Sequence, residues 1–251
     1  MDVVSYLARI GLDAPPAVNR DGLRRLQLAH LLAVPFENLH IARRQPLSLD
    51  RGKLYEKIVE KRRGGICYEL NGLFAELLEA LGFQVERLSA RVFSQSEGTH
   101  GRPRDHLCLR VVLEGTPWLV DVGFGRGFRS PLRLDTRDWQ DDPEGRFRVL
   151  PEGEELALER ADGGGEPTPV YLLDPREDLA LEAFEEMCLH HQTSRDSHFT
   201  LGPLCSIARA DGRDSLRDGV AVRERGGRRD ERQLASEAEV WGWIRDEVGL
   251  E

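Results

Sequence analysis

The chain has 251 residues, of which 40% are hydrophobic and 31% are charged, a composition typical of a globular protein and not of a disordered one. Its 35 Lys and Arg residues against 44 Asp and Glu residues give a net charge of −9. This balance argues against a broad nucleic-acid interface, because such a surface is basic. No apolar run approaches the ~20 residues of a membrane span, and the N-terminal stretch lacks the basic and apolar regions of a signal peptide.

The first third of the chain predicts helices, because its apolar residues recur at helical spacing. The clearest stripe is Leu70, Phe74, Leu77 and Leu81, followed by Gly82 at the position where a helix commonly ends in a left-handed conformation. Weaker stripes predict further helices near residues 3–10, 23–33 and 54–59.

After residue 82 the pattern changes to short segments that are rich in β-branched residues and separated by turn residues, which predicts antiparallel strands. The acidic, glycine-rich segment 151–167 predicts a loop. Two Asp-Gly pairs beyond residue 198 predict a small meander. We expect strands at 84–93, 106–113, 118–122, 145–150 and 168–173, and helices at 180–190 and 234–248.

This order predicts an α+β protein in three parts: a helical part (1–83), a small antiparallel sheet or barrel (84–195) and a small mixed α/β part (196–251). A chain of this length buries enough surface to fold without disulfides or metal. Its four cysteines form no CxxC pair and match no zinc-finger spacing. Such sparse cysteines indicate a reducing compartment, so we expect a cytoplasmic protein.

Cys67 is the strongest candidate nucleophile. It follows Gly64 and Gly65 at the predicted start of the helix over 70–81, where free backbone N–H groups and the helix dipole favour thiolate over thiol. The two glycines can adopt conformations forbidden to other residues and leave room for a substrate beside the sulfur. The competing interpretation is a buried structural cysteine, which is the commoner role of this residue.

His106 and Asp121 are the candidate partners of this thiol, because a nucleophilic cysteine needs an imidazole base and the imidazole needs an orienting acceptor. His106 begins HLCLRVVL, the most strand-like segment of the chain. Asp121 lies in the apolar run WLVDV, where a buried carboxylate needs a partner that a neighbouring strand could supply. Asp121 could instead cap the turn that follows it.

Two other groups of chemically capable residues are weaker candidates. Cys108 shares a strand face with His106 and is expected to fill the core. Cys188, His190 and His191 resemble metal ligands, but no second ligand pair stands at a usual spacing, so no metal site is predicted.

The glycine-rich run 123–127, GFGRG, has two interpretations. It is not the dinucleotide-binding fingerprint, because no βαβ unit surrounds it. Its backbone amides could approach a phosphate, with Arg126 adding positive charge. It could equally be a plain corner between two strands.

Four motifs together resemble the arylamine N-acetyltransferase family: VPFENLHI (34–41), RGGICYELN (63–71), DHLCLRV (105–111) and VDVGFG (120–125). Their order and spacing match that family over essentially the whole chain. The resemblance implies a helical bundle, a central antiparallel β-barrel and a small α/β lid around a core like that of papain-like cysteine enzymes. It also implies a catalytic triad with Cys67 as nucleophile, His106 as base and Asp121 as orienting residue.

The same resemblance implies the binding residues. Phe36, Phe124 and Phe128 would line the acceptor pocket, while Gly123, Gly125, Arg126 and Gly127 would lie near the coenzyme A pyrophosphate. In some relatives Thr-Gly stands shortly before the triad histidine and contacts coenzyme A, whereas this chain has Arg102-Pro103 there. The basic run 223–229 could steer coenzyme A phosphates, or it could be a solvated hairpin end.

The implied activity is transfer of an acetyl group from acetyl-CoA, as cosubstrate and not as a permanent cofactor, through a Cys67 thioester. The acceptor would be the nitrogen of an arylamine or hydrazine, or the oxygen of an N-hydroxyarylamine. A macrolactam-forming amide synthase of the same family and a hydrolase or transglutaminase-like enzyme with the same triad are the alternatives. No nucleic acid or membrane partner is expected, and oligomeric state stays open.

Overall fold

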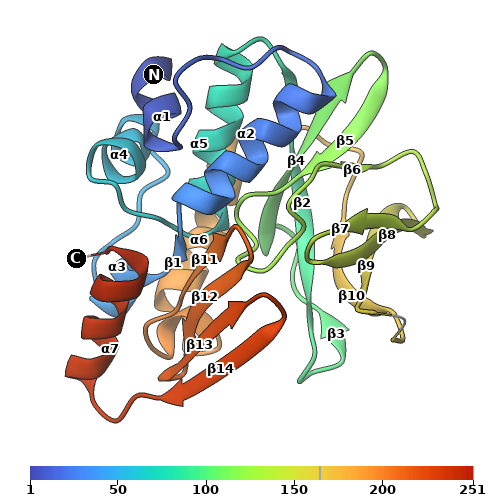
Figure 1. Ribbon diagram of the computed structural model, residues 1–251. Helices are drawn as coiled ribbons and strands as arrows, with labels where there is room; N and C mark the ends of the chain where they lie inside the picture. The colour runs from blue at the N-terminus through green and yellow to red at the C-terminus, as the bar shows by residue number, and fades with distance from the viewer. Residues whose placement is uncertain (164, 251) are drawn as a thin grey trace.

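The computed structural model describes residues 1–163 and 165–250. Residue 164 of the predicted loop 151–167 and residue 251 of the predicted α/β part therefore lie outside the described residues. The molecule combines an N-terminal group of helices, an antiparallel barrel sheet and a smaller C-terminal sheet with a terminal helix, as Figure 1 shows. This arrangement confirms the predicted fold class, whereas the boundaries between the three parts stay a prediction.

The N-terminal helices surround α5, which begins at Cys67 because Ile66 before it has extended backbone angles, and ends before Gly82, whose φ is +95°. Its apolar face packs against the other helices and against one face of the barrel, so that Phe74 is fully buried. The helices of this part are α1 (Val3–Arg9), α2 (Arg20–Ala33), α3 (Leu39–Ala42), α4 (Arg51–Tyr55), the π-helical turn η1 (Glu56–Glu60) and α5 (Cys67–Ala80).

The barrel sheet is antiparallel in the order β6-β5-β4-β2-β10-β9-β8-β7, with β3 beside β2. Its two edge strands are bridged by one side chain, because Gln140 Oε1 accepts from Arg133 N (2.7 Å) and Gln140 Nε2 donates to Arg133 O (3.0 Å). The barrel is therefore nearly closed. Its strands are β2 (Gln84–Ser94), β3 (Thr99–His100), β4 (His106–Leu113), β5 (Thr116–Val120), β6 (Leu132–Arg133), β7 (Gln140–Asp142), β8 (Gly145–Glu152), β9 (Glu155–Ala161) and β10 (Thr168–Leu173).

The loop predicted over 151–167 is wrong for most of its length, because β8 and β9 form a hairpin there. Two of the acidic residues that suggested a loop lie on the outer face of this hairpin and pair with arginines of other barrel strands. Glu159 contacts Arg148 on β8 (2.7 Å), and Glu155 contacts Arg91 on β2. Leu158 points the other way, into the barrel core.

A helical segment returns the chain to the N-terminal helices before the second sheet. It comprises η2 (Leu181–Phe184), α6 (Glu185–Thr193) and η3 (His198–Thr200), and it packs on the same core as α5. The predicted helix at 180–190 is therefore confirmed, although its first turn is a 3₁₀ helix.

The C-terminal sheet is antiparallel in the order β1-β11-β12-β13-β14. The predicted meander is confirmed, but its first strand also pairs with β1 of the N-terminal part, so that Phe36 lies opposite Ser206. The elements are β1 (Phe36–Glu37), β11 (Cys205–Arg209), β12 (Gly212–Arg217), β13 (Val220–Arg225), β14 (Arg228–Gln233), α7 (Glu237–Trp243) and η4 (Ile244–Val248). Among the described residues, no helix is long and apolar enough to cross a membrane.

Candidate active site

Cys67 is the first residue of α5 and its side chain is almost fully buried, with 3% exposure. The helix start is completed by Glu69, whose Oε2 accepts the backbone N–H of Ile66 at 3.0 Å. Lys57 Nζ lies 2.7 Å from the other oxygen of the same carboxylate. A buried, charge-paired residue therefore fixes the turn that presents the thiol.

The two glycines before Cys67 are needed because other residues approach them closely. They are not needed for unusual backbone angles, since neither has a positive φ. A Cβ on Gly64 would lie 2.0 Å from Pro35 O, and a Cβ on Gly65 would lie 2.6 Å from Glu69 Oε2. The chain at Gly65 also forms a bridge with Phe36 of β1. The space that the sequence assigned to a substrate is thus occupied by the protein's own residues.

His106 and Asp121 meet because β4 and β5 are neighbouring strands, as predicted. Asp121 directly follows the last residue of β5, and its Oδ2 lies 2.7 Å from His106 Nε2. Both side chains are buried. The Cys67 thiol interacts with the same imidazole ring. Because Asp121 contacts Nε2, the ring nitrogen open to the thiol is Nδ1. The structure therefore brings the three predicted residues together.

The environment of His106 favours the charged imidazolium. Burial by itself disfavours that charge, but the Asp121 carboxylate and the Cys67 thiol outweigh it and raise the pKa of His106 to about 10. An imidazolium beside a thiol at neutral pH is the partner that an ionised sulfur requires.

Two residues that the sequence analysis did not single out complete the surroundings of Asp121. Asn71 Nδ2 donates to Asp121 Oδ1 at 2.8 Å and to Leu107 O at 2.6 Å, and Asn71 Oδ1 accepts from Val122 N at 2.9 Å. Tyr171 on β10 donates to Asp121 Oδ2 at 3.4 Å and packs against the His106 ring. Asn71 lies one helical turn after Cys67, and this spacing was the available sequence signal for it.

A second group of contacts holds the chain just before His106. Tyr68 Oη donates to Arg104 O (2.8 Å) and to Asp105 O (3.0 Å). His191 on α6 stacks on Tyr68 and lies 3.2 Å from Asp105 Oδ1. The side chain of Tyr68, the residue after Cys67, therefore holds the backbone just before His106.

The three predicted acceptor-pocket phenylalanines occupy different places. Phe124 packs edge-on against His106, with ring centroids 5.3 Å apart, and is only partly buried. Phe36 lies on β1, is partly buried and packs on Phe199. Phe128 has 1% exposure and packs on Phe147 in the barrel core. Phe124 therefore lies against His106, Phe36 lies beside Gly65 and Gly125, and Phe128 contributes to the barrel core.

The glycine-rich run forms a loop that starts against Cys67. A Cβ on Gly123 would lie 2.7 Å from Cys67 Cα, so this position requires glycine. Gly125 has a φ of +80°, which favours glycine as well. Arg126, which was predicted to add charge for a phosphate, forms ion pairs with Glu224 (3.0 Å) and Glu144 (3.9 Å).

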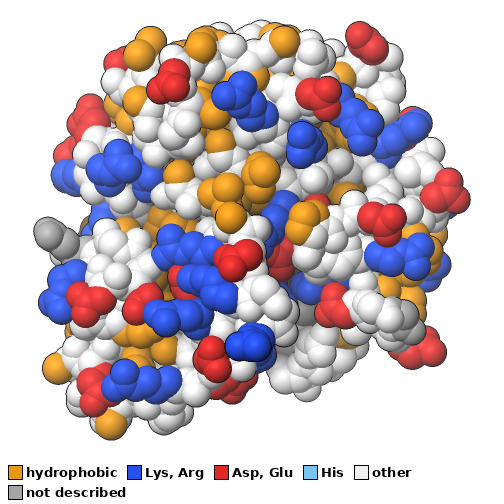
Figure 2. All heavy atoms as spheres, in the orientation of Figure 1, with side chains coloured by type: hydrophobic (Ala, Val, Ile, Leu, Met, Phe, Trp, Pro, Cys, Tyr) orange, Lys and Arg blue, Asp and Glu red, His pale blue; other side chains and the backbone are white. Residues whose placement is uncertain are grey.

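The remaining candidates, Cys108, Cys188 and the basic run 223–229, lie among residues that hold the fold together. Cys108 is fully buried in the barrel core, as expected. Around Cys188, as elsewhere in the described residues, no cluster of three potential metal ligands is found. The basic run 223–229 forms the β13–β14 hairpin, and Figure 2 shows its basic side chains interleaved with acidic ones. Arg225 pairs with Asp214 (2.7 Å) and Arg229 with Glu224 (2.9 Å).

Comparisons with known proteins agree with this fold and arrangement. The N-acetyltransferase family model matches residues 20–251. The arylamine N-acetyltransferase of Mycolicibacterium smegmatis is 34% identical over 258 residues, which cover 100% of this chain and 92% of that protein. A solved structure of the M. smegmatis enzyme covers 100% of this chain and 93% of its own, with a TM-score of 0.92 and 33% identity. The structure of the Mycobacterium marinum arylamine N-acetyltransferase in complex with CoA has a TM-score of 0.90 and 31% identity. The match covers 99% of this chain and 93% of the M. marinum chain.

The helical layer, barrel and family match define an N-acetyltransferase, a class of enzymes. Within that class, the chain belongs to the arylamine N-acetyltransferase family.

Proposed function

We propose that this enzyme transfers an acetyl group from acetyl-CoA to an aromatic amine or hydrazine through a thioester on Cys67. The observation that carries the proposal is the single imidazole of His106, which lies between the Cys67 thiol and the Asp121 carboxylate. In the first half-reaction the Cys67 sulfur attacks the thioester carbonyl. The bond from that carbonyl to the coenzyme A sulfur breaks, and the departing thiolate takes the proton held by His106.

The second half-reaction regenerates the thiolate. The acceptor nitrogen attacks the acetyl-Cys67 carbonyl, neutral imidazole takes its proton, and the sulfur leaves as thiolate. An aromatic amine is neutral at pH 7 and can attack without prior deprotonation, and its ring suits a site bordered by Phe36 and Phe124. The oxygen of an N-hydroxyarylamine can react in the same way. Two half-reactions at one sulfur predict ping-pong kinetics.

Coenzyme A is the proposed partner of the loop 123–127. The solved M. marinum relative is a complex with CoA, and the loop begins beside Cys67. Gly123, Gly125 and Gly127 can bring backbone amides close to a pyrophosphate. Arg126 would have to exchange its contact with Glu224 for the phosphate, and no permanently bound cofactor is needed.

Intact-mass measurement tests the proposal directly. Incubation with acetyl-CoA and no acceptor should add one acetyl group to the wild-type chain and to Cys108→Ala, and none to Cys67→Ala. Cys108 is the matched control because it is a buried cysteine two residues from His106 on the same strand. An unchanged wild-type mass, or an adduct that persists in Cys67→Ala, contradicts the assignment.

An acceptor panel separates this function from the two alternatives with the same triad. Arylamines and hydrazines should release free coenzyme A thiol continuously and yield acetylated products. Continuous thiol release without any acceptor would instead indicate a hydrolase. Turnover only with an activated, carrier-bound chain that ends in an amine would indicate an amide synthase.

A further inference from the structure

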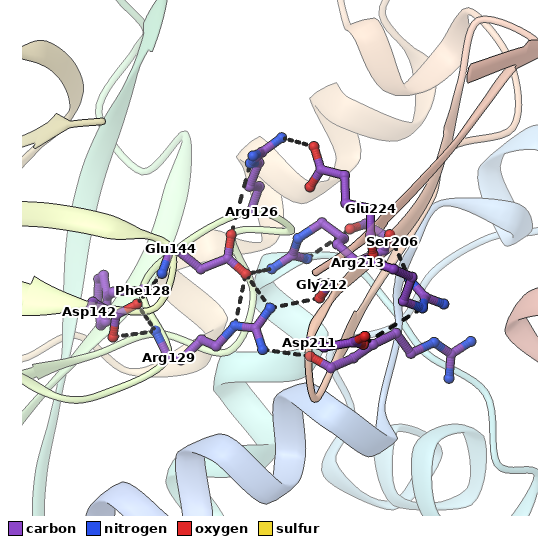
Figure 3. A network of polar contacts seen from close by, with 12 residues as sticks. Arg126, Phe128, Arg129, Asp142, Glu144, Ser206, Asp211, Gly212, Arg213 and Glu224 are labelled. Atoms are coloured by element: carbon purple, nitrogen blue, oxygen red, sulfur yellow. Dashed lines mark hydrogen bonds and ion pairs between the residues drawn. The ribbon is translucent and has the colours of Figure 1, made fainter. Parts of the chain in front are cut away.

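We propose that Arg213, on β12 of the C-terminal sheet, is a positioning residue for the loop 123–127 and thereby for substrate binding at the Cys67 site. The proposal rests on the acetyl transfer proposed above. It adds to that function a residue far away in sequence that contacts neither Cys67, His106 nor Asp121. Figure 3 shows the polar network through which it acts.

The side chain of Arg213 binds the backbone of the loop 123–127. Its side chain has 4% exposure, and Nη1 donates both to Gly125 O and to Ser206 Oγ, the latter at 2.9 Å. Ser206 Oγ donates to the same Gly125 carbonyl at 3.3 Å. One carbonyl in the middle of the loop therefore accepts two hydrogen bonds from the C-terminal sheet, and one of them is charge-assisted, the stronger kind.

Glu144, just before β8, fixes the guanidinium of Arg213. Its Oε1 accepts from Arg213 Nη2 at 3.1 Å, and from Arg129 Nε and Nη2 at 2.8 and 2.6 Å. Arg129 in turn donates to the carbonyls of Arg209 (2.6 Å) and Gly212 (2.7 Å) at the β11–β12 turn. The buried Glu144 carboxylate, which also lies 3.9 Å from Arg126 of the loop, thus sets the place from which Arg213 reaches Gly125 (Figure 3).

The two arginines have separable roles. Arg129 joins the barrel to the C-terminal sheet through backbone carbonyls of that sheet, which is a structural link. Of the two, Arg213 is the one that contacts the loop, through Gly125. A change at Arg213 that spares Glu144 and Arg129 therefore loosens the loop while it leaves the junction between barrel and sheet connected.

The first two residues of the loop 123–127 lie directly against Cys67 and His106. Gly123 lies against the backbone of Cys67, and Phe124 packs on the ring of His106. The triad itself is fixed independently, by Asn71 and by the pairing of β4 with β5. Loss of the Gly125 anchor should therefore weaken the binding of acetyl-CoA and acceptor more than it changes the reactivity of the thiol.

The test compares KM with the intrinsic reactivity of Cys67. Arg213→Met removes the charge-assisted donor to Gly125 O and the ion pair with Glu144. Ser206→Ala removes only the neutral donor and keeps every ion pair, so this variant should stay folded. We expect KM for acetyl-CoA or acceptor to rise about tenfold in Arg213→Met, a change of ~1.4 kcal/mol, and about threefold in Ser206→Ala. Alkylation of Cys67 by iodoacetamide should stay within twofold of wild type across the pH range.

Arg217→Gln is the matched control. Arg217 is an exposed arginine of the same strand whose side chain pairs with Asp218 at 3.5 Å, so its KM values should equal those of wild type. Unchanged KM values in both Ser206→Ala and Arg213→Met overturn the proposal, as does a loss of alkylation that parallels the loss of transfer. A wild-type chain that is never acetylated would instead refute the proposed function, which distinguishes the two failures.

Discussion

His106 and His30 show how one residue type is given opposite charge states in this enzyme. Both imidazoles are buried. Burial opposes the charge of His106, but the Asp121 carboxylate and the Cys67 thiol dominate and raise its pKa to about 10. Within residues 1–163 and 165–250, neither ring nitrogen of His30 has a hydrogen-bond partner, and burial, together with nearby Arg9, lowers its pKa to about 3. A carboxylate 2.7 Å away is thus what makes His106 a charged imidazolium while His30 stays neutral.

Asp121→Asn should remove most of the thiol reactivity at neutral pH. Without the carboxylate the pKa of His106 falls, because the group that outweighs burial is gone. The wild-type imidazolium is retained until the pH approaches about 10, whereas the variant should lose it at a much lower pH. The measurement is the rate of Cys67 alkylation by iodoacetamide between pH 5 and 10. A variant profile that coincides with that of wild type would remove Asp121 from its orienting role.

Asn71→Ala should impair both stability and acetylation. The substitution leaves Asp121 Oδ1, Leu107 O and Val122 N without the donor or acceptor that Asn71 supplies, and a buried group left unpaired costs roughly 1–3 kcal/mol. We expect a lower midpoint of urea unfolding and a single-turnover acetylation rate at least tenfold below wild type. Leu70→Met, a volume-conserving change next to Asn71 on the same helix, is the control.

At the scale of elements, the site depends on how closely the loop after β5 approaches the start of α5. Gly123→Ala places a Cβ 2.7 Å from Cys67 Cα and 2.8 Å from Asn71 Nδ2, distances that force the helix and the loop apart. Gly202→Ala is the matched control, because its added Cβ meets nothing within 4 Å.

We expect Gly123→Ala to lose at least 100-fold in the rate of Cys67 acetylation, about 3 kcal/mol, while Gly202→Ala keeps the wild-type rate. Both variants should be assayed by stopped-flow with acetyl-CoA alone, and their far-UV circular dichroism compared. Normal acetylation of a folded Gly123→Ala chain would show that the close approach has no role in positioning the thiol.

The sequence predicted the parts of the site that local patterns encode. Cys67 at a helix start and His106 at a strand start follow from periodicity, and the pairing of β4 with β5 follows from a short turn between them. Tyr171 could not be found in this way, because its place beside Asp121 depends on β10 pairing with β2 across a long stretch of chain. The hairpin of β8 and β9 was missed because its acidic residues find cross-strand arginines, which composition alone does not reveal.

For the whole molecule, the fully buried His30 predicts a loss of stability in mild acid. Burial, with Arg9 nearby, lowers the pKa of His30 to about 3. The unfolded chain binds this proton near pH 6.5 and the folded chain does not. The contribution of His30 is therefore fully present above about 6.5 and is lost as the pH falls towards 3.

His30→Leu should reduce this dependence. Between pH 7 and 5 the wild-type enzyme should lose about 2 kcal/mol of unfolding free energy through His30 alone, and the variant should lack that component. Urea unfolding at the two pH values gives the difference, and His100→Gln, a change at a less buried histidine, is the control. An equal acid loss in wild type and His30→Leu would contradict the prediction.

The short strand β1 links completion of the site around Cys67 to the synthesis of the C-terminal sheet. It joins residues 36–37 to residues 205–206 and, on its other side, contacts Gly65 just before the nucleophile. A chain that has emerged from the ribosome only as far as β10 already contains Cys67, His106 and Asp121, but the edge that steadies the turn before Cys67 has no partner. We therefore expect the thiol to reach its final position only after the C-terminal sheet has been made, so that a nascent chain contains Cys67, His106 and Asp121 before the turn that holds the thiol is complete.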